Sequence, residues 1–345
     1  MKAVVLTGIR KMQLTEIPEP VISSDKDVKI KLKTIGVCGS DIHYYSEGKI
    51  GSQVVDYPFR VGHECSGEIA EIGAAVDNVK VGDLVVVDPS VHCGSCDQCL
   101  AGRPHTCRNN KFLGCPGQIE GCLSEFIVMP SFTCFPVTGK LNAIQAALIE
   151  PLTIGVYAVN LAAIKNKNTT VAIFGAGPIG LSILMKLKAD MVADVGMIEP
   201  LDYRLIKAGD IGASWQINPG EEEVEEEVKN RNELLLDVVF EASGEQEAVN
   251  NAIKILKPGG KLVLVGIPPE AQYVFNMDLM RRKELTLINV RRQNHCVQEA
   301  IDLVTSGAVD VEKMVTHEFN LEETPVAFDM VEGYKFGTVK AMINL

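Results

Sequence analysis

The stretch Thr170-Val-Ala-Ile-Phe-Gly175-Ala-Gly177-Pro178-Ile-Gly180 decides the fold of this chain. Its first five residues predict a buried strand, and a helical run follows the glycines over residues 179–189. A second strand, residues 195–199, ends at Glu199, nineteen residues beyond Gly180. A strand, a glycine-rich turn, a helix and an acidic strand end in this order are typical of a dinucleotide-binding unit.

Each glycine of this turn has its own task. Gly175 permits a tight turn, Gly177 lets the backbone approach a pyrophosphate, and Gly180 lets the helix pack closely on the strand. The free N–H groups that open the helix attract phosphate. The Glu199 carboxylate would accept from ribose hydroxyls and repel a 2′-phosphate, which favours NAD over NADP. The predicted cofactor contacts are Gly175, Gly177, Pro178, Ile179, Gly180, Glu199, Arg204, Val265, Gly266 and Arg291, although Arg204 could equally be a surface residue.

Strands and helices continue to alternate up to residue 287, which predicts a doubly wound parallel sheet over residues 152–287. Residues 1–151 hold short strands divided by glycines, a pattern that favours a separate β-rich domain. We expect residues 288–345 to complete that first domain, through a helix over 297–305 and a closing strand over 338–344. The later strands of the parallel sheet are predicted at 235–241, 261–265 and 285–288.

Four cysteines lie within residues 93–107, in the pattern Cys93-x2-Cys96-x2-Cys99-x7-Cys107. Four thiolates can close a tetrahedron around one Zn²⁺ and leave no position for water, so this site is predicted to be structural. A cysteine cluster alone also fits a zinc-ribbon binding module. The dinucleotide turn and the acidic charge of the chain weigh against that alternative.

A second set of possible zinc ligands is dispersed: Cys38, His63, Glu64 and Glu150. Sulfur, nitrogen and oxygen donors together are typical of a catalytic zinc with an open position for water or substrate. Taken singly, Cys38 and His63 have common structural roles, since a lone cysteine is usually a small buried apolar residue. The set gains weight only from its context.

Composition excludes several classes of partner. The chain has 345 residues, a net charge of −12 and a pI of about 5.1, so its field repels nucleic acid and anionic membranes. We expect the ten cysteines to be reduced thiols and metal ligands in the cytoplasm, because secretory features are lacking. The acidic run over residues 221–227 is interpreted as a solvated helix face.

Several motifs resemble the zinc-dependent medium-chain alcohol dehydrogenases. They are Gly36-Val-Cys38-Gly-Ser40-Asp41, Gly62-His-Glu-x2-Gly67-x5-Gly73-x2-Val76, the four-cysteine lobe and the dinucleotide turn. The resemblance extends over essentially the whole chain. It implies a GroES-like catalytic domain and a Rossmann domain with the active site in the cleft between them, and a homotetramer or homodimer.

Within that family the chain is most similar to the polyol branch, typified by sorbitol and xylitol dehydrogenases. The segments are Ser40-Asp-Ile-His43-Tyr44, Gly48-Lys-Ile-Gly51 and Ile149-Glu150-Pro151-Leu152. The resemblance implies that Cys38, His63 and Glu64 ligate the catalytic zinc. Glu150 is then a direct ligand, a ligand through water, or one that exchanges with Glu64.

The resemblance also implies a proton path from Ser40 through the ribose hydroxyls of the cofactor to His43. The alternative for Ser40 is a turn residue that caps a helix at Asp41. Together these residues predict hydride transfer from a secondary alcohol or polyol to NAD. A catalytically idle protein that binds zinc and nucleotide is the alternative of another class, and the presence of every expected catalytic group weighs against it.

Tyr44, Phe112, Glu150 and Arg291 match positions that line the substrate pocket in the polyol branch. Arg292 departs from the pattern, because polyol enzymes usually have tyrosine there. A second guanidinium could favour a sugar phosphate or an acidic sugar. It could equally form a salt bridge with a nearby carboxylate.

Overall fold

A computed structural model describes residues 1–269 and 272–345 of the chain. The chain divides into two compact units. The first comprises Met1–Glu150 and Val315–Leu345, and the second comprises Pro151–Met314. The return to the first unit begins at Val315, later than residue 288, where we expected it. Residues that follow β17 (Thr286–Asn289), the last strand of the second unit's sheet, also belong to the second unit. They include the helix over Val297–Thr305, which we expected in the first domain but which packs on the second unit, where Glu299 Oε1 lies 3.1 Å from Lys186 Nζ.

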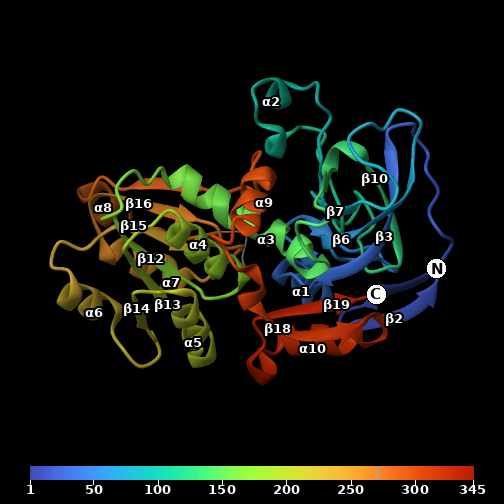
Figure 1. The fold of residues 1–345 in the computed structure, drawn as a ribbon. Coiled ribbons are helices and arrows are strands. Elements are labelled where there is room, and N and C mark those ends of the chain that lie inside the picture. The colour runs from blue at the N-terminus through green and yellow to red at the C-terminus, as the bar shows by residue number, and fades with distance from the viewer. Residues whose placement is uncertain (270–271) are drawn as a thin grey trace. The chain divides into compact units, whose positions relative to one another are not determined.

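The second unit is built on a parallel sheet with the strand order β14-β13-β12-β15-β16-β17 (Figure 1). The order reverses between β12 and β15, which makes a switch point at their carboxyl ends. The predicted doubly wound parallel sheet is confirmed. The strands are β12 (Thr170–Phe174), β13 (Asp194–Ile198), β14 (Trp215–Ile217), β15 (Leu236–Glu241), β16 (Leu256–Leu264) and β17.

Helices connect these strands and cover the sheet (Figure 1). The strands are apolar along their length, and Val171, Ile173 and Phe240 are completely buried, as both faces of such a sheet require. The acidic run over residues 221–227 extends into the first turn of α6. Val224 and Val228 of this helix are buried, whereas most of the glutamates face solvent. The helices are α4 (Pro178–Ala189), α5 (Asp202–Ile211), α6 (Val224–Arg231), α7 (Gln246–Ile255), α8 (Met277–Arg282) and α9 (Val297–Thr305).

The first unit contains a largely antiparallel sheet with the order β11-β7-β6-β3-β19-β18, and β10 also pairs with β3. The chain's closing strand, β19, lies antiparallel to β3, with Met342 opposite Gly36. This pairing is why the last residues belong to the first unit. The strands are β3 (Asp27–Gly36), β6 (Glu64–Ile72), β7 (Leu84–Val87), β10 (Phe126–Pro130), β11 (Cys134–Pro136), β18 (Val315–Asn320) and β19 (Lys340–Asn344).

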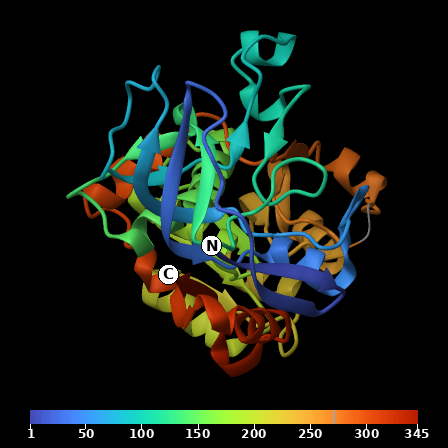
Figure 2. The same cartoon turned by 90° about the vertical axis from the view of Figure 1, so that its right-hand side faces the viewer.

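Shorter elements surround this sheet. A lobe that contains α2 stands out from the rest of the first unit, and the two chain termini lie near each other (Figures 1 and 2). The helices of the first unit are α1 (Gly39–Glu47), α2 (Asp97–Leu100) and α10 (Thr324–Glu332). The longer helix α3 (Ala143–Ala162) begins in the first unit and ends in the second. The small strands are β1 (Lys2–Gly8), β2 (Lys11–Glu16), β4 (Lys49–Ile50), β5 (Gln53–Val54), β8 (Ser90–Val91) and β9 (Lys111–Phe112). Single 3₁₀ turns occupy Pro104–Thr106, Ser131–Thr133, Val311–Met314, Leu321–Glu323 and Lys335–Gly337.

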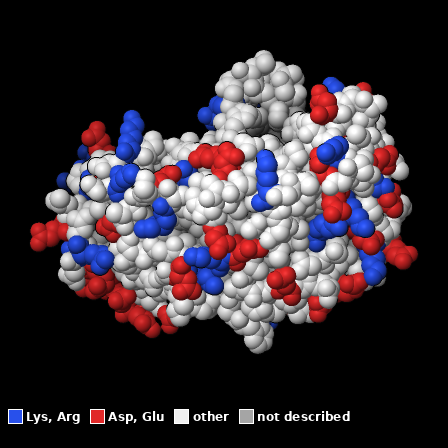
Figure 3. All heavy atoms as spheres, viewed as in Figure 1, with Lys and Arg blue, Asp and Glu red and all other residues white. Residues whose placement is uncertain are grey.

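One helix, α3, is long and apolar enough to cross a membrane, with a mean hydropathy of 1.3. However, 72% of that apolar window is buried inside the protein. Burial in the core therefore accounts for its composition. On the face seen in Figure 3, basic and acidic side chains are intermixed, as expected for a surface whose net charge is moderately negative.

Candidate functional site

The short helix α1 positions the first group of predicted site residues. Cys38 is its N-cap, and the backbone N–H of Cys38 donates to Asp41 Oδ2 at 3.2 Å. This capping interaction ties the thiol to the start of the helix. Ser40, His43 and Tyr44 then follow on the same two turns of α1.

Asp41 orients His63. Its carboxylate is 1% exposed, accepts the backbone N–H of Gly62 at 3.0 Å and lies 3.3 Å from His63 Nδ1. Burial lowers the pKa of His63, but the nearby Asp41 and Cys38 more than offset it, so this pKa is raised well above its usual value. A proton on Nδ1 facing Asp41 leaves Nε2 as the nitrogen available to a metal. Sequence analysis did not assign Asp41 a role, although its place three residues after Cys38 is a capping signal.

Cys38, His63 and Glu64 offer ligand atoms that all lie within 4.8 Å of one another. His63 and Glu64 are buried, and Cys38 is half-buried. One sulfur, one nitrogen and one oxygen donor at this spacing fit a zinc ion with an open position. The structure therefore brings together three of the four ligands predicted from dispersed positions, and their metal role remains a prediction.

Lys340 also lies at this site, and like that of Asp41 its role was not predicted from the sequence. It lies on β19 with 1% of its surface exposed, and it donates to Glu64 Oε2 and to the Val37 carbonyl oxygen at 3.1 Å. Burial lowers the pKa of Lys340, but Glu64 and Cys38 raise it by more. The pKa is therefore raised overall, and the ammonium stays charged. Lys340 and Glu64 are 276 residues apart, so no local pattern could have joined them.

Glu150, in α3, lies outside this mutually close ligand set among the described residues. It is 8% exposed, and its burial raises its pKa to about 7, with a further increase from Glu64 that His63 and Lys340 oppose. The charges of Glu64 and His63 therefore affect the pKa of Glu150. Whether Glu64 or Glu150 ligates zinc at rest remains open.

Gly36→Ala is expected to weaken zinc binding. A Cβ at residue 36 would lie 2.2 Å from Glu64 Oε2, and Lys340 leaves that carboxylate little freedom to move. We expect at least about a tenfold weaker affinity for the zinc that Cys38, His63 and Glu64 are predicted to bind. Competition with a chelator measures it. The control is Gly39→Ala, because a Cβ at Gly39 meets nothing within 4 Å and Gly39 does not have a positive φ. Gly82→Ala is unsuitable, because Gly82 has a positive φ. Equal zinc affinity in both variants would contradict the prediction.

Two of the predicted proton-path and pocket residues of the first unit, Ser40 and Phe112, contact members of the ligand set. Ser40 Oγ is 3.3 Å from Cys38 Sγ, and the Phe112 ring lies 5.3 Å from the His63 ring. Tyr44 is buried, and its hydroxyl donates to Gln53 Oε1 at 3.1 Å. His43 lies on the outer side of α1, 29% exposed, with Nδ1 3.3 Å from Glu47 Oε1.

The four clustered cysteines form a second ligand set. All four sulfur atoms lie within 4.8 Å of one another, and the Cys93–Cys107 and Cys96–Cys99 sulfur separations are 3.4 and 3.6 Å. These distances are those of free thiols around a common centre rather than of disulfides. Two backbone N–H groups, from Cys93 and Asn109, donate to Cys107 Sγ at 3.3 Å each and would stabilise a thiolate there. The donor set fits a closed zinc site.

The dinucleotide turn has the geometry that its glycines predict. Gly175 has φ +89°, and a Cβ at Gly180 would lie only 1.8 Å from the Gly175 carbonyl oxygen. Gly177 is the N-cap of α4, and a Cβ there would find only Arg204 Nη1 nearby, at 3.7 Å. The space over Gly177 is thus open to a ligand. Pro178 and Ile179 are the first two helical residues.

Glu199 has a role inside the protein that sequence analysis did not foresee. It is 4% exposed, and its Oε2 accepts the backbone N–H of Ala176 at 2.7 Å. Its Oε1 accepts the N–H of Leu201 at 3.2 Å, and Arg204 Nη1 lies 3.9 Å from Oε2. The carboxylate therefore supports the turn directly. Its predicted contact with ribose and the cofactor contact of Arg204 remain predictions.

Arg291 and Arg292 follow β17 in the second unit. Arg291 is exposed, while Arg292 is half-buried and has φ +52°, a conformation that non-glycine residues rarely adopt. Tyr44 and Phe112 belong to the first unit. That the two arginines share a substrate pocket with them remains a prediction.

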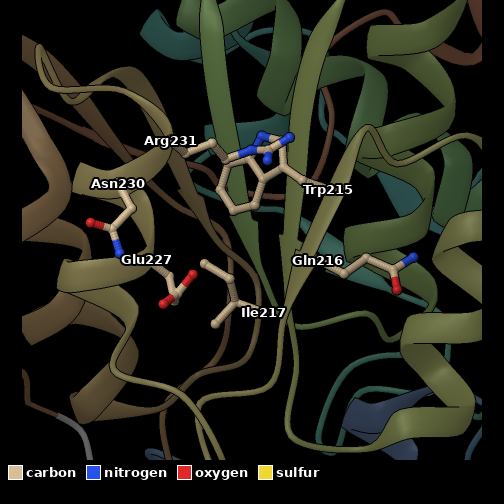
Figure 4. A pocket seen from close by; sticks show the side chains of 6 residues that line it. All are labelled: Trp215, Gln216, Ile217, Glu227, Asn230 and Arg231. Carbon is tan, nitrogen blue, oxygen red and sulfur yellow. The ribbon is translucent and has the colours of Figure 1, made fainter.

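A cavity of about 200 Å³ lies elsewhere in the second unit, between β14 and α6 (Figure 4). The Arg231 guanidinium lies over the Trp215 ring there, 5.3 Å from its centroid. None of its lining residues was predicted to bind a ligand. They are Trp215, Gln216, Ile217, Glu227, Asn230 and Arg231.

Comparison with known families follows the same division of the chain. Residues 24–139 match the alcohol dehydrogenase GroES-like domain, and residues 178–306 match the zinc-binding dehydrogenase domain. The sorbitol dehydrogenase of Bacillus subtilis (strain 168) is 35% identical over 344 residues, which cover 99% of this chain and 97% of that protein. The chain belongs to the zinc-binding alcohol dehydrogenase family.

Solved structures of the family are similar to this dehydrogenase along its length. The galactitol-1-phosphate dehydrogenase of Escherichia coli has a TM-score of 0.92 at 27% identity and covers 100% of both chains. A zinc-binding dehydrogenase of Sinorhizobium meliloti 1021, bound to NADP, has a TM-score of 0.91 at 27% identity and covers 100% of this chain and 99% of its own. The predicted family, fold class and dehydrogenase class are confirmed.

Proposed function

We propose that this dehydrogenase oxidises a secondary hydroxyl of a polyol, such as sorbitol or xylitol, with NAD as the hydride acceptor. The observation that carries the proposal is the convergence of Cys38, His63 and Glu64, in the same chain as an intact dinucleotide turn. The similarity to a sorbitol dehydrogenase supports the substrate class. Sulfur, nitrogen and oxygen donors within 4.8 Å of one another argue against a protein that merely binds nucleotide.

Cys38, His63 and Glu64 would hold the catalytic zinc, with Glu150 beside them, and Cys93, Cys96, Cys99 and Cys107 would hold the structural one. A catalytic zinc supplies Lewis-acid polarisation of an alcohol oxygen. The protein orients the ligands before the ion binds, because Asp41 fixes the His63 ring and Lys340 fixes the Glu64 carboxylate.

Side chains of α1 remove the proton of the substrate hydroxyl. Ser40 Oγ lies beside the ligand set and can accept this proton. His43, on the same helix, is partly exposed to solvent. An imidazole can take up a proton on one nitrogen and release another from the second, which suits a relay to solvent. The Phe112 ring, 5.3 Å from the His63 ring, adds apolar surface beside the ligand set.

A panel of alcohols tests the proposed reaction. NADH formation by the zinc-loaded enzyme should be fastest with polyols such as sorbitol and xylitol, slower with simple secondary alcohols and slowest with ethanol. Cys38→Ala should lose at least about a thousandfold in kcat/KM, since the open zinc is no longer held. An enzyme that holds both zincs and NAD yet reduces no NAD with any alcohol would overturn the proposal in favour of the idle protein.

Glu199→Gln is expected to narrow the preference for NAD over NADP by about tenfold in kcat/KM. The amide keeps an oxygen for the Ala176 N–H but loses the charge that repels a 2′-phosphate. Glu199→Ser is the comparison, because it also loses the support of the turn and should weaken both cofactors. Steady-state kinetics with each cofactor measures the ratio. A wild-type enzyme that prefers NADP, the cofactor bound in the S. meliloti structure, would contradict the assignment.

A sugar phosphate is the second candidate substrate, favoured by Arg292 and by the similarity to galactitol-1-phosphate dehydrogenase. Arg292→Tyr is expected to shift the kcat/KM ratio toward neutral polyol and away from its phosphate ester by roughly ten- to a hundredfold. Arg292→Lys should restore only part of the original ratio, because lysine lacks the planar fork. Should the ratio stay the same in the tyrosine variant, Arg292 is a structural ion-pair partner.

The remaining proposals concern assembly and location. The family resemblance supports a homodimer or homotetramer in the cytoplasm, with a small alcohol as the partner and neither nucleic acid nor membrane bound. Sedimentation of the purified enzyme distinguishes a monomer from both assemblies.

A further inference from the structure

Glu241 is a completely buried carboxylate that neither the motifs nor the zinc sites explain. It ends β15 and is 0% exposed. Its Oε1 accepts the N–H of Ser243 at 2.7 Å, the hydroxyl of Ser243 at 2.6 Å and the N–H of Gly244 at 2.8 Å. Burying a carboxylate charge costs free energy unless a cation or several donors stabilise it. The three donors to Oε1 therefore indicate that the fold requires a carboxylate at this position.

The other oxygen of Glu241 reaches a segment distant in sequence. Its Oε2 accepts the hydroxyl of Tyr273 at 3.2 Å. Burial and the Glu241 charge raise the pKa of Tyr273 well above its usual value, so the phenol remains a donor at physiological pH. The Tyr273 ring also contacts Phe275, with 6.2 Å between ring centroids.

The turn after β15 (residues 242–244) and residues 265–267 after β16 are packed so closely that neither Gly244 nor Gly266 has room for a Cβ. A Cβ at Gly266 would lie 2.3 Å from Gly244 N and 2.7 Å from Glu241 Oε2. The N–H groups of Val265 and Gly266 donate to the Glu241 backbone oxygen at 2.8 and 2.9 Å. Glu241 therefore joins the two segments through both its backbone and its side chain.

This junction lies at the cofactor end of the sheet. Glu241 is opposite Phe174, the last residue of β12, across the point where the strand order reverses. A Cβ at Gly175 would lie 3.0 Å from the N atom of Ser243, so the dinucleotide turn packs directly on the turn that Glu241 holds. Dinucleotides bind outside the carboxyl ends of strands at such a reversal.

We propose that Glu241 and Tyr273 form a latch that holds Val265 and Gly266, the residues directly after β16, in the conformation that receives the nicotinamide cofactor. Both act as positioning residues: the hydroxyl of Tyr273 secures its own segment to the carboxylate, and the carboxylate secures the turn under Gly175. The latch rests on the proposed use of NAD. When the hydrogen bond between Tyr273 and Glu241 is lost, only a fraction of the protein molecules can bind the cofactor. The apparent affinity for the cofactor then falls in proportion to that fraction.

The decisive variant is Tyr273→Phe, which removes one oxygen and keeps the ring contact with Phe275. Its Kd for NADH, measured by calorimetry on zinc-loaded enzyme, should rise about five- to tenfold. The KM for NAD should rise in parallel, while the KM for alcohol at saturating NAD stays within about twofold. Tyr334→Phe, at a 56% exposed site in the first unit, is the matched control and should leave the Kd unchanged.

A double-mutant cycle identifies the partner of the hydroxyl. Glu241→Gln alone should also weaken NADH binding, and Tyr273→Phe added to it should cost less than about a third of its effect in the wild type. Equal effects in both backgrounds would overturn the latch, as would an unchanged Kd in Tyr273→Phe. If Tyr273→Phe does not fold, an unchanged Kd in Glu241→Gln overturns it equally. A wild-type enzyme that binds no NADH overturns the proposed function itself, so the two failures are distinct.

Discussion

Lys340→Met is expected to lower the free energy of unfolding by about 3–5 kcal/mol when the open zinc site has been emptied. The methionine fills the space of the lysine but leaves the Glu64 carboxylate, 1% exposed, without its cation. Zinc binding should recover part of the loss, because the ion then neutralises the same carboxylate. Urea unfolding with and without bound zinc measures both quantities.

The control for this variant is an exposed lysine–glutamate pair in the same sheet. Lys33 on β3 and Glu68 on β6 lie 3.1 Å apart, with side chains 33% and 48% exposed. Lys33→Met should therefore cost less than about 1 kcal/mol, since solvent screens the pair. Equal losses in the two variants would mean that the burial of Lys340 has no special energetic role.

Cys107→Ser is expected to release the structural zinc and to lower Tm by more than about 10 °C. Cys107 is the most buried member of the four-cysteine set, and its sulfur contacts those of Cys93 and Cys96 at 3.4 and 3.8 Å. Without one thiolate the closed site opens to water. The kcat of correctly folded enzyme should stay within about threefold, because chemistry occurs at the other zinc.

Metal analysis and calorimetry check this prediction. Cys134→Ser removes a thiol that is 2% exposed and belongs to neither ligand set, so it controls for the loss of a buried sulfur. In the wild type, a chelator should remove the zinc of the Cys38 site before that of the Cys107 site, and activity should fall with the first. Normal stability of Cys107→Ser with abolished turnover would reverse the assignment of the two sites.

Local patterns predicted much of the second unit. The strand over 170–174 and the helix over 297–305 were found with the same bounds, as β12 and α9. The turn geometry of Gly175 and Gly180 also followed from the sequence, because a tight turn and close packing leave no room for a Cβ. The short strand β14, three residues long, was not predicted, since so few residues carry no periodic signal.

The candidate site divides in the same way. The clustered cysteines were predictable because their four ligands lie within one short lobe, and spacing alone then implies a common centre. The dispersed zinc ligands were predicted from the resemblance to a family. The roles of Asp41 and Lys340 were not predicted, and neither was the inward turn of Glu199 toward Ala176.

The sequence by itself determined the βαβ order and the clustering of the four cysteines, because these depend on neighbours within a turn, a helix or a short lobe. The class of reaction followed from the resemblance to a family. Only the tertiary structure decided that Lys340 neutralises Glu64 and that Tyr273 reaches Glu241. The physical reason is that a buried charge must find a partner wherever the folded chain brings one. Here the partners are Lys340, on a strand that pairs with β3 in the sheet, and Tyr273, nine residues after the end of β16.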